Sequence, residues 1–99
     1  MSNLITHYAP STGKITPYTI PTPGSVAGPI VLGPDGNMWS IGFISNNIIR
    51  ISLAGVITEF PLPTANSQPV WIVKGPEVSG SGTLWISESA SGKIARVIP

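Results

Sequence analysis

Charged side chains are scarce in this sequence. Of its 99 residues, 9% are Asp, Glu, Lys or Arg, whereas an ordinary soluble domain is about 25% charged. A surface this poor in charge suggests that part of it is buried against further protein in the working particle. The net charge of +1 comes from scattered basic residues, so we expect neither a nucleic-acid partner nor a membrane partner.

Cysteine is absent, and histidine occurs once, at His7. These scarcities exclude a disulfide framework, a thiolate metal site and a multi-histidine metal site within one chain. No apolar run approaches the roughly 20 residues that span a bilayer, and the first residues lack the pattern of a signal peptide. We therefore expect a soluble protein that is cytoplasmic by default.

Glycine and proline, by contrast, are abundant, with eleven of each. They separate short apolar runs that are rich in Ile, Val, Thr and Trp, such as GPIVL, NIIRI and GVITEF. Such punctuation argues against long helices and is typical of many short strands at regular spacing. The fold class that we predict is all-β.

The sequence repeats itself over nearly its whole length. Residues 15–36, ITPYTIPTPGSVAGPIVLGPDG, align with residues 57–78, ITEFPLPTANSQPVWIVKGPEV, at an offset of 42 residues. Trp39 and Trp85 then correspond at an offset of 46, so the second copy carries four extra residues near 79–82. A period of about 40–45 residues with four short strands is typical of a β-propeller blade.

We therefore predict antiparallel four-stranded propeller blades, about two to a chain. Residues 1–14 are expected to form the third strand of a preceding blade and its turn. Residues 15–56 would be the first repeat and residues 57–99 the second, whose outer strand is missing. Asp35-Gly36 predicts a tight hairpin between the first two strands of a blade, and the insertion near 79–82 predicts a longer, looser loop there.

The predicted strands cover the end of one blade, one complete blade and three strands of another. They are expected near 29–32, 38–43, 47–52, 56–62, 70–74, 84–88 and 93–98, after a leading strand at 3–9 and the start of the first repeat.

Two stretches carry a family resemblance. ITEFPLPTANSQP…GTLWISESASGKIARV and ITPYTIPTPGS…GPDGNMWSIGFISNNIIRI resemble blades of the virginiamycin B lyase (streptogramin lyase) family. The resemblance implies a seven-bladed propeller for a full-length member. It also implies a reaction that opens a cyclic depsipeptide by elimination, with a His and a Glu from neighbouring strands of one blade and Mg²⁺ bound nearby.

The positions of that His–Glu pair can be transferred to this sequence residue by residue. In the first repeat they hold Gly28 and Gly42, neither of which can move a proton. In the second repeat, allowing for the insertion, they hold Val70 and Glu88. Glu88 is thus one candidate catalytic residue, and the alternative is a strand-end carboxylate that bonds a loop or a neighbouring strand. His7 lies outside the motif and is the other candidate, as a base.

Aromatic and basic side chains give further expectations. Trp39 and Trp85 are expected to pack between blades. Trp71 has Pro29 at its repeat position, and near the channel it would stack on a ligand. The arginines of the third strands are expected to be exposed or paired with blade carboxylates.

Three functions remain open at this stage. The first is a module whose main property is self-assembly into a homo-oligomeric ring, without a complete lyase pair. Two blades per chain suit six or eight blades, hence a trimer or tetramer, although residues 3–9 and 93–98 then claim the same place. The second is a lyase-like enzyme acting in the channel of an assembled ring, which alone would need a cofactor, Mg²⁺. The third is a propeller that binds a small molecule in its channel.

Overall fold

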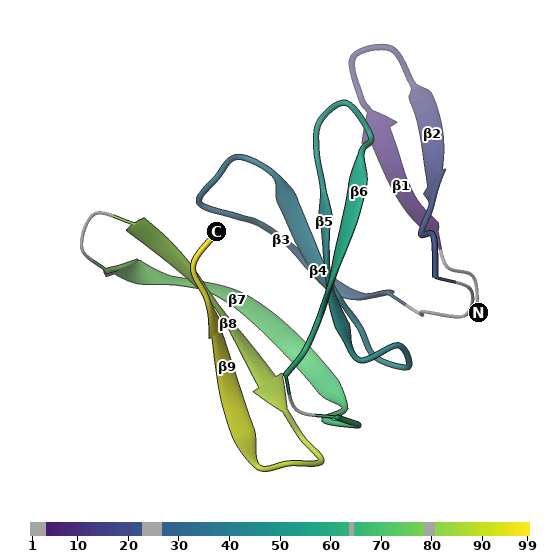
Figure 1. The fold of residues 1–99 in the computed structure, drawn as a ribbon. Helices are drawn as coiled ribbons and strands as arrows, with labels where there is room; N and C mark the ends of the chain where they lie inside the picture. The colour runs from purple at the N-terminus through teal and green to yellow at the C-terminus, as the bar shows by residue number, and fades with distance from the viewer. Residues whose placement is uncertain (1–3, 23–26, 64, 79–80) are drawn as a thin grey trace.

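The structure, a computed structural model, describes residues 4–22, 27–63, 65–78 and 81–99. In these residues nine strands form three antiparallel sheets, and no helix occurs (Figure 1). The sheets have the strand orders β1-β2, β3-β4-β5-β6 and β7-β8-β9. This confirms the all-β prediction and the predicted succession of two, four and three strands.

The three sheets follow one another along the chain. The N-terminal hairpin consists of β1 (Leu4–Ala9) and β2 (Lys14–Thr19). The central sheet consists of β3 (Ala27–Leu32), β4 (Met38–Gly42), β5 (Asn47–Ile51) and β6 (Ile57–Pro61). The C-terminal sheet consists of β7 (Pro69–Val78), β8 (Ser81–Glu88) and β9 (Lys93–Val97).

The connections between the first two strands differ between the two larger sheets. β3 and β4 are joined by the predicted tight turn, in which Gly36 has a φ of 83°, a conformation that favours glycine. The looser loop predicted near 79–82 is wrong for the part that the structure describes: β7 and β8 are prolonged until Val78 pairs with Ser81. Residues 79 and 80 lie outside the described residues. Pairing as far as Val78 and Ser81 satisfies backbone N–H and C=O groups in this part of the ladder.

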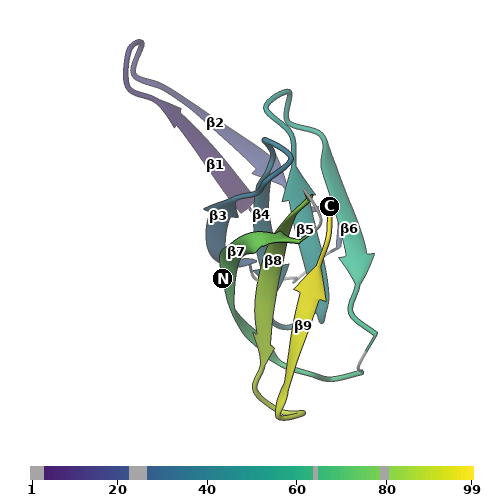
Figure 2. The ribbon, with the colours of Figure 1, turned by 90° about the vertical axis from the view of Figure 1, so that its left-hand side faces the viewer.

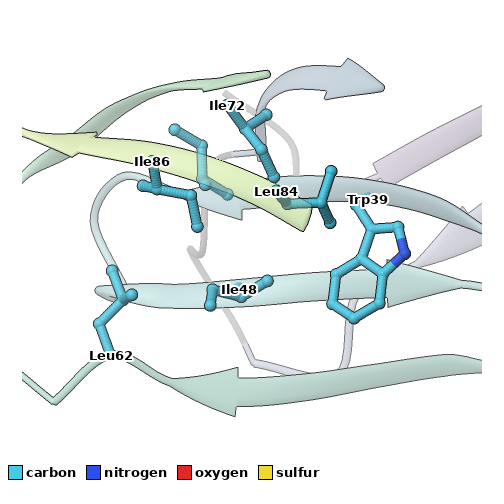
Figure 3. Close-up of a cluster of buried hydrophobic side chains, with 7 residues drawn as sticks. Trp39, Ile48, Leu62, Ile72, Leu84 and Ile86 are labelled. Atoms are coloured by element: carbon cyan, nitrogen blue, oxygen red, sulfur yellow. The ribbon is translucent and has the colours of Figure 1, made fainter. Parts of the chain in front are cut away.

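The hydrophobic core lies between the central and C-terminal sheets (Figure 3). Its buried members are Trp39, Ile41, Ile48, Leu62, Ile72, Leu84 and Ile86. The side chains alternate along each strand, so Trp39 and Ile41 face the C-terminal sheet, while Ser40 between them donates to backbone carbonyls of β3. Each fully buried aliphatic side chain contributes roughly 1.5–3 kcal/mol, which makes this interface the principal source of stability.

The N-terminal hairpin is less closely seated on the opposite face of the central sheet. It projects beyond the other two sheets in both views of the ribbon (Figures 1 and 2). A cavity of about 380 Å³ is lined by hairpin residues such as His7 and Tyr18 and by central-sheet residues such as Met38 and Ile51. The radius of gyration, 13.6 Å, slightly exceeds the value of about 12.6 Å for a compact chain of this length.

Side-chain hydrogen bonds fix the crossings between sheets. The carboxylate of Glu59 on β6 accepts from the backbone N–H and the hydroxyl of Thr22, which follows β2. In the next crossing, Asn46 Oδ1 accepts from the backbone N–H and the hydroxyl of Ser67. Each sheet is therefore anchored to the segment that leads from or to its neighbour.

Candidate functional site

The structure brings the two positions of the expected His–Glu pair together in the C-terminal sheet. Pro69 pairs with Glu88 and Trp71 pairs with Ser87, with a register irregularity between them. Val70 lies in this irregularity and directly follows Pro69, the cross-strand partner of Glu88. The spacing read from the sequence thus corresponds to real proximity, but the position next to the carboxylate holds an aliphatic side chain.

The central sheet repeats this arrangement with different residues. Ala27 pairs with Gly42, and a register irregularity follows between Ala27 and Ile30. Gly28 lies within it, as Val70 does in the C-terminal sheet. Neither glycine has a group that accepts or donates a proton through its side chain, so the central sheet offers no acid–base pair at this place.

Glu88 is buried, with 3% of its surface exposed. It belongs to the face of β8 that packs on the central sheet, together with Leu84 and Ile86. The hydroxyl of Ser91 donates to Glu88 Oε1 at 3.3 Å and to the Glu88 carbonyl at the same distance. The backbone N–H of Ser91 also donates to that carbonyl. The described contacts of Glu88 are therefore those of a residue that closes the turn between β8 and β9.

The turn between β4 and β5 is closed by another acceptor. Gly42 occupies the position of Glu88, and its cross-strand partner Asn47 is buried. The hydroxyl of Ser45, the repeat equivalent of Ser91, donates to Asn47 Oδ1 at 2.7 Å. A Cβ added to Gly42 would overlap both Asn47 Oδ1 and Ser45 Oγ. The amide oxygen of Asn47 in the central sheet and the carboxylate of Glu88 in the C-terminal sheet thus accept hydrogen bonds from equivalent serine hydroxyls.

His7 lies far from Glu88 within one chain. It is an exposed residue of β1, paired with Thr16 of β2, and it lines the cavity beneath the hairpin. β1 and β8 belong to the first and last sheets, with the central sheet between them (Figure 1). The two residues that the sequence offered as catalytic candidates are therefore not brought together by the described fold of a single chain.

Trp71 lies on the outer face of the C-terminal sheet, the face turned away from the central sheet. Its surface is 57% exposed. With Val73, Trp85 and Ile94 it lines a shallow hollow of about 170 Å³. An exposed indole in such a hollow can stack on a ring or on apolar side chains.

Each blade tryptophan has its own hydrogen-bond acceptor. Trp39 Nε1 donates to Asp35 Oδ1 at 2.8 Å, whereas Trp85 Nε1 donates to Thr83 Oγ1 at 3.1 Å. Burial raises the pKa of Asp35, but hydrogen bonds from Trp39 and Asn37 outweigh it and leave the pKa below its ordinary value of 3.8. The sequence interpretation treated Asp35 as a turn residue only. The signal for its second role was its position four residues before Trp39.

The arginines of the third strands cover these tryptophans. Arg50 places its Cζ atom 5.6 Å from the ring centroid of Trp39 and 5.4 Å from that of Phe60. Its guanidinium nitrogen lies 4.0 Å from the carboxylate of Asp35, as expected for an arginine paired with a blade carboxylate. Arg96 lies 5.9 Å from the ring of Trp85. Cation–π contacts therefore recur at equivalent places in both sheets.

No group of three or more His, Cys, Asp or Glu side chains that could hold a metal ion occurs in the described part of the chain. Glu88 is engaged by Ser91. The described ranges also contain no helix long and apolar enough to cross a membrane.

Comparisons with known proteins give a consistent result. The model of the virginiamycin B lyase family matches residues 2–99. Among solved structures, selenomethionine-substituted virginiamycin B lyase from Staphylococcus aureus is 38% identical with a TM-score of 0.88, and the alignment covers 99% of this chain and 32% of that one. A comparison with curated proteins gave no match.

Two further solved structures are similar. One is a catalytically inactive variant of the Staphylococcus aureus enzyme, with a histidine replaced by alanine, in complex with quinupristin. It is 39% identical with a TM-score of 0.85, and the coverage is 96% of this chain and 31% of that one. The other, a streptogramin B lyase, is 32% identical with a TM-score of 0.81 and coverages of 98% and 34%. The chain thus spans about a third of the length of the solved structures that it matches.

Proposed function

Because the chain belongs to the virginiamycin B lyase family, we propose that it is a β-propeller module that assembles with further copies into a closed ring. Each chain would supply about two blades, so three or four chains would complete the ring. Closed cyclic symmetry with head-to-tail contacts is the arrangement that such a repeat favours. The module contributes architecture, and its own pair positions lack the histidine.

The observation that carries this proposal is that a sheet face which is buried in the central sheet is exposed at the equivalent place in the C-terminal sheet. In the central sheet, the face with Trp39 and Ile48 packs against the C-terminal sheet, and Trp39 is only 2% exposed. The equivalent face of the C-terminal sheet carries Trp85 and Ile94, and Ile94 is 71% exposed. An apolar sheet face of this kind is a site of association. Within the chain the equivalent face is covered by the next blade, so we expect a blade of another copy to cover the face of the C-terminal sheet.

The mass in solution tests the proposal. Light scattering over a range of protein concentrations should give three or four times the 10.3 kDa of one chain. Ile94→Arg would place a charge on the proposed contact face and should lower that mass. Ala90→Arg, at an exposed position of the turn after β8, is a matched control and should leave the mass unchanged. A wild-type mass of 10.3 kDa at every concentration would contradict the proposal.

A second candidate function is lyase activity in an assembled ring. The observation that favours it is that Val70 directly follows Pro69, the cross-strand partner of Glu88, so a histidine at position 70 would lie on the strand that pairs with Glu88. The similar structure with quinupristin is of a variant inactivated by loss of a histidine. In this chain residue 70 is a valine, so the second proton-transfer group of the expected pair is not supplied from that position.

Incubation with quinupristin and Mg²⁺ separates the two functions. Ring opening by elimination adds no water, so a product would keep the mass of the substrate and differ in chromatographic retention and fragmentation. We expect no linear product from the wild-type chain, and a product that is absent from Glu88→Gln would establish the lyase function instead. Val70→His tests whether the missing partner is the limiting feature.

A further inference from the structure

The strand β9 has an open edge. Among the described strands it pairs only with β8, whereas β5, its equivalent in the central sheet, pairs with β4 on one side and β6 on the other. A groove of about 320 Å³ is lined by Val97 and Ile98, at the C-terminal end of β9, and by central-sheet residues such as Trp39 and Phe60. Figure 2 shows β9 at the edge of the C-terminal sheet, where a fourth strand would pair.

The chain contains a second copy of the strand that fills this position in the central sheet. β6 begins ITEFP, and the corresponding stretch of β2 reads ITPYT. The pairing register is also the same, since Thr58 lies opposite Arg50 in the central sheet and Thr16 lies opposite His7 in the hairpin. By the repeat, Arg96 of β9 is the residue that corresponds to both Arg50 and His7. β1 and β9 are thus alternative partners for β2.

The present partner of β2 holds it weakly to the rest of the molecule. β1 exposes Leu4 and Tyr8, β2 exposes Ile15, and the cavity of about 380 Å³ separates the hairpin from the central sheet. An isolated two-stranded hairpin is at best marginally stable in water. Exchange of β1 for a strand that is already part of a three-stranded sheet would break the six residue pairs between β1 and β2 and replace them with pairs between β9 and β2.

We propose that β9 of one copy pairs with β2 of a second copy and takes the place of that copy's β1. The pairing would set Arg96 opposite Thr16, Val97 opposite Ile15 and Lys93 opposite Thr19, in the register that β5 and β6 use. This inference rests on the proposed assembly and specifies its contact. The strand exchange resolves the competition between residues 3–9 and 93–98, because β1 leaves the sheet.

The exchange also covers the apolar faces that a single chain leaves open. Within the chain, Val31 and Trp39 pack toward Ile72 and Leu84. Their equivalents across the new contact are Val73 and Trp85 of one copy against Ile30 and Met38 of the second copy. Ile30 is 46% exposed in the single chain. The new contact therefore repeats an interface that this sequence already forms, with the same blade face on each side.

Proline is compatible with the proposed pairing. Pro17 would lie opposite Ala95, and in the hairpin it already lies opposite Thr6 within a regular ladder. Proline is tolerated on an edge strand, where its missing N–H faces away from the partner. β2 would remain the outermost strand of its blade, as β6 is in the central sheet.

Engineered disulfides test the exchange directly, because the chain has no cysteine of its own. In the pinned variant, His7→Cys with Thr16→Cys ties β1 to β2, which are directly opposite and within the span of a disulfide. In the bridged variant, Arg96→Cys with Thr16→Cys should form a disulfide between copies. Arg96→Cys with Lys14→Cys, two residues out of register, is the matched control and should not.

The expected results distinguish this inference from the assembly that it refines. Wild-type protein and the reduced pinned variant should associate, whereas the oxidised pinned variant should stay at the mass of one chain. The bridged variant should migrate as covalent multimers on a non-reducing gel, and its control as a single chain. Association of the oxidised pinned variant would overturn strand exchange while the ring stands. A wild-type protein that never associates would overturn the ring as well.

Discussion

A graft between the two blades tests whether Glu88 belongs to a turn or to an active site. The perturbation is Gly42→Glu with Asn47→Lys, which places the residue types of Glu88 and Lys93 at their repeat positions in the central sheet. Gly42 and Asn47 are cross-strand partners, as Glu88 and Lys93 are. The graft therefore moves a complete pair from one sheet into the same geometry in the other.

Each single change should destabilise the chain. In Gly42→Glu the new Cβ overlaps Asn47 Oδ1 and Ser45 Oγ, and both side chains must turn aside and give up their hydrogen bond of 2.7 Å. Overpacking in a buried position typically costs about 1–3 kcal/mol. Asn47→Lys removes the acceptor of Ser45 and brings an ammonium group to a buried position, at a cost of about 1–3 kcal/mol.

The two changes together should cost less than their sum. Replacing Asn47 removes one of the two groups that the new Cβ overlaps, and the Ser45 hydroxyl then has only to turn. In its new position it can donate to the introduced carboxylate, as Ser91 donates to Glu88, and that carboxylate lies opposite the introduced ammonium. We expect a coupling free energy of about 1–3 kcal/mol, in the range found for contacting residues. The measurement is urea unfolding followed by tryptophan fluorescence, at one protein concentration for all variants.

Additivity would refute this reasoning. If the losses in free energy of unfolding of the two single variants add within about 0.5 kcal/mol, then the carboxylate and the amide do not play equivalent parts in the two turns. The reverse graft, Glu88→Gly with Lys93→Asn, is the control and should show coupling of the same sign. If Glu88→Gly alone instead raises the free energy of unfolding, then Glu88 is held at a cost to stability, as active-site residues often are.

The remaining predictions concern packing, electrostatics and the crossings. Asp35→Ala should lower the free energy of unfolding by about 1–3 kcal/mol at pH 7, because the indole N–H of Trp39 loses its acceptor. The folded-state pKa of Asp35 is lowered, so the contribution of its charge is present above pH 3.8 and is lost as the pH falls through the folded value; urea titrations at pH 7 and pH 3 should show the deficit shrink. Ile86→Ala should cost about 2–5 kcal/mol, whereas Ile94→Ala should cost less than about 0.5 kcal/mol in dilute, unassociated protein, as thermal unfolding would show. Glu59→Gln should reduce amide protection in the crossing after β2 in hydrogen exchange, and unchanged protection would contradict its anchoring role.

The arrangement of strands could be predicted because the repeat supplies two readings of one blade. Short apolar runs alone do not distinguish strand from buried helix, but the correspondence of Trp39 with Trp85 places each run in a frame. The same frame placed Val70 beside Glu88. The insertion near 79–82 was misread because glycine and serine are typical of loops, whereas in the structure the ladder continues to Val78 and Ser81.

The contacts of the site could not be predicted from residue types. That Asp35 accepts from Trp39 depends on how the turn folds back over the strand. That Asn47 does in one sheet what Glu88 does in the other depends on the absence of a side chain at Gly42. In both cases the role of one residue depends on which residue lies next to it in the folded chain. The packing of Trp39 between sheets was predicted and is confirmed, while the covering of Trp85 stays a prediction.

The separate acceptors of the two tryptophans have a consequence for how such chains recombine. Asp35 and Trp39 form one matched set, and Thr83 and Trp85 form another. Of the two products of a genetic crossover between these acceptor positions, one would carry a tryptophan with neither acceptor and leave its indole N–H without an oxygen. A crossover in the segments between sheets transfers each set whole. Duplication and exchange of blades in this lineage should therefore be tolerated at sheet boundaries and selected against within the first hairpin of a blade.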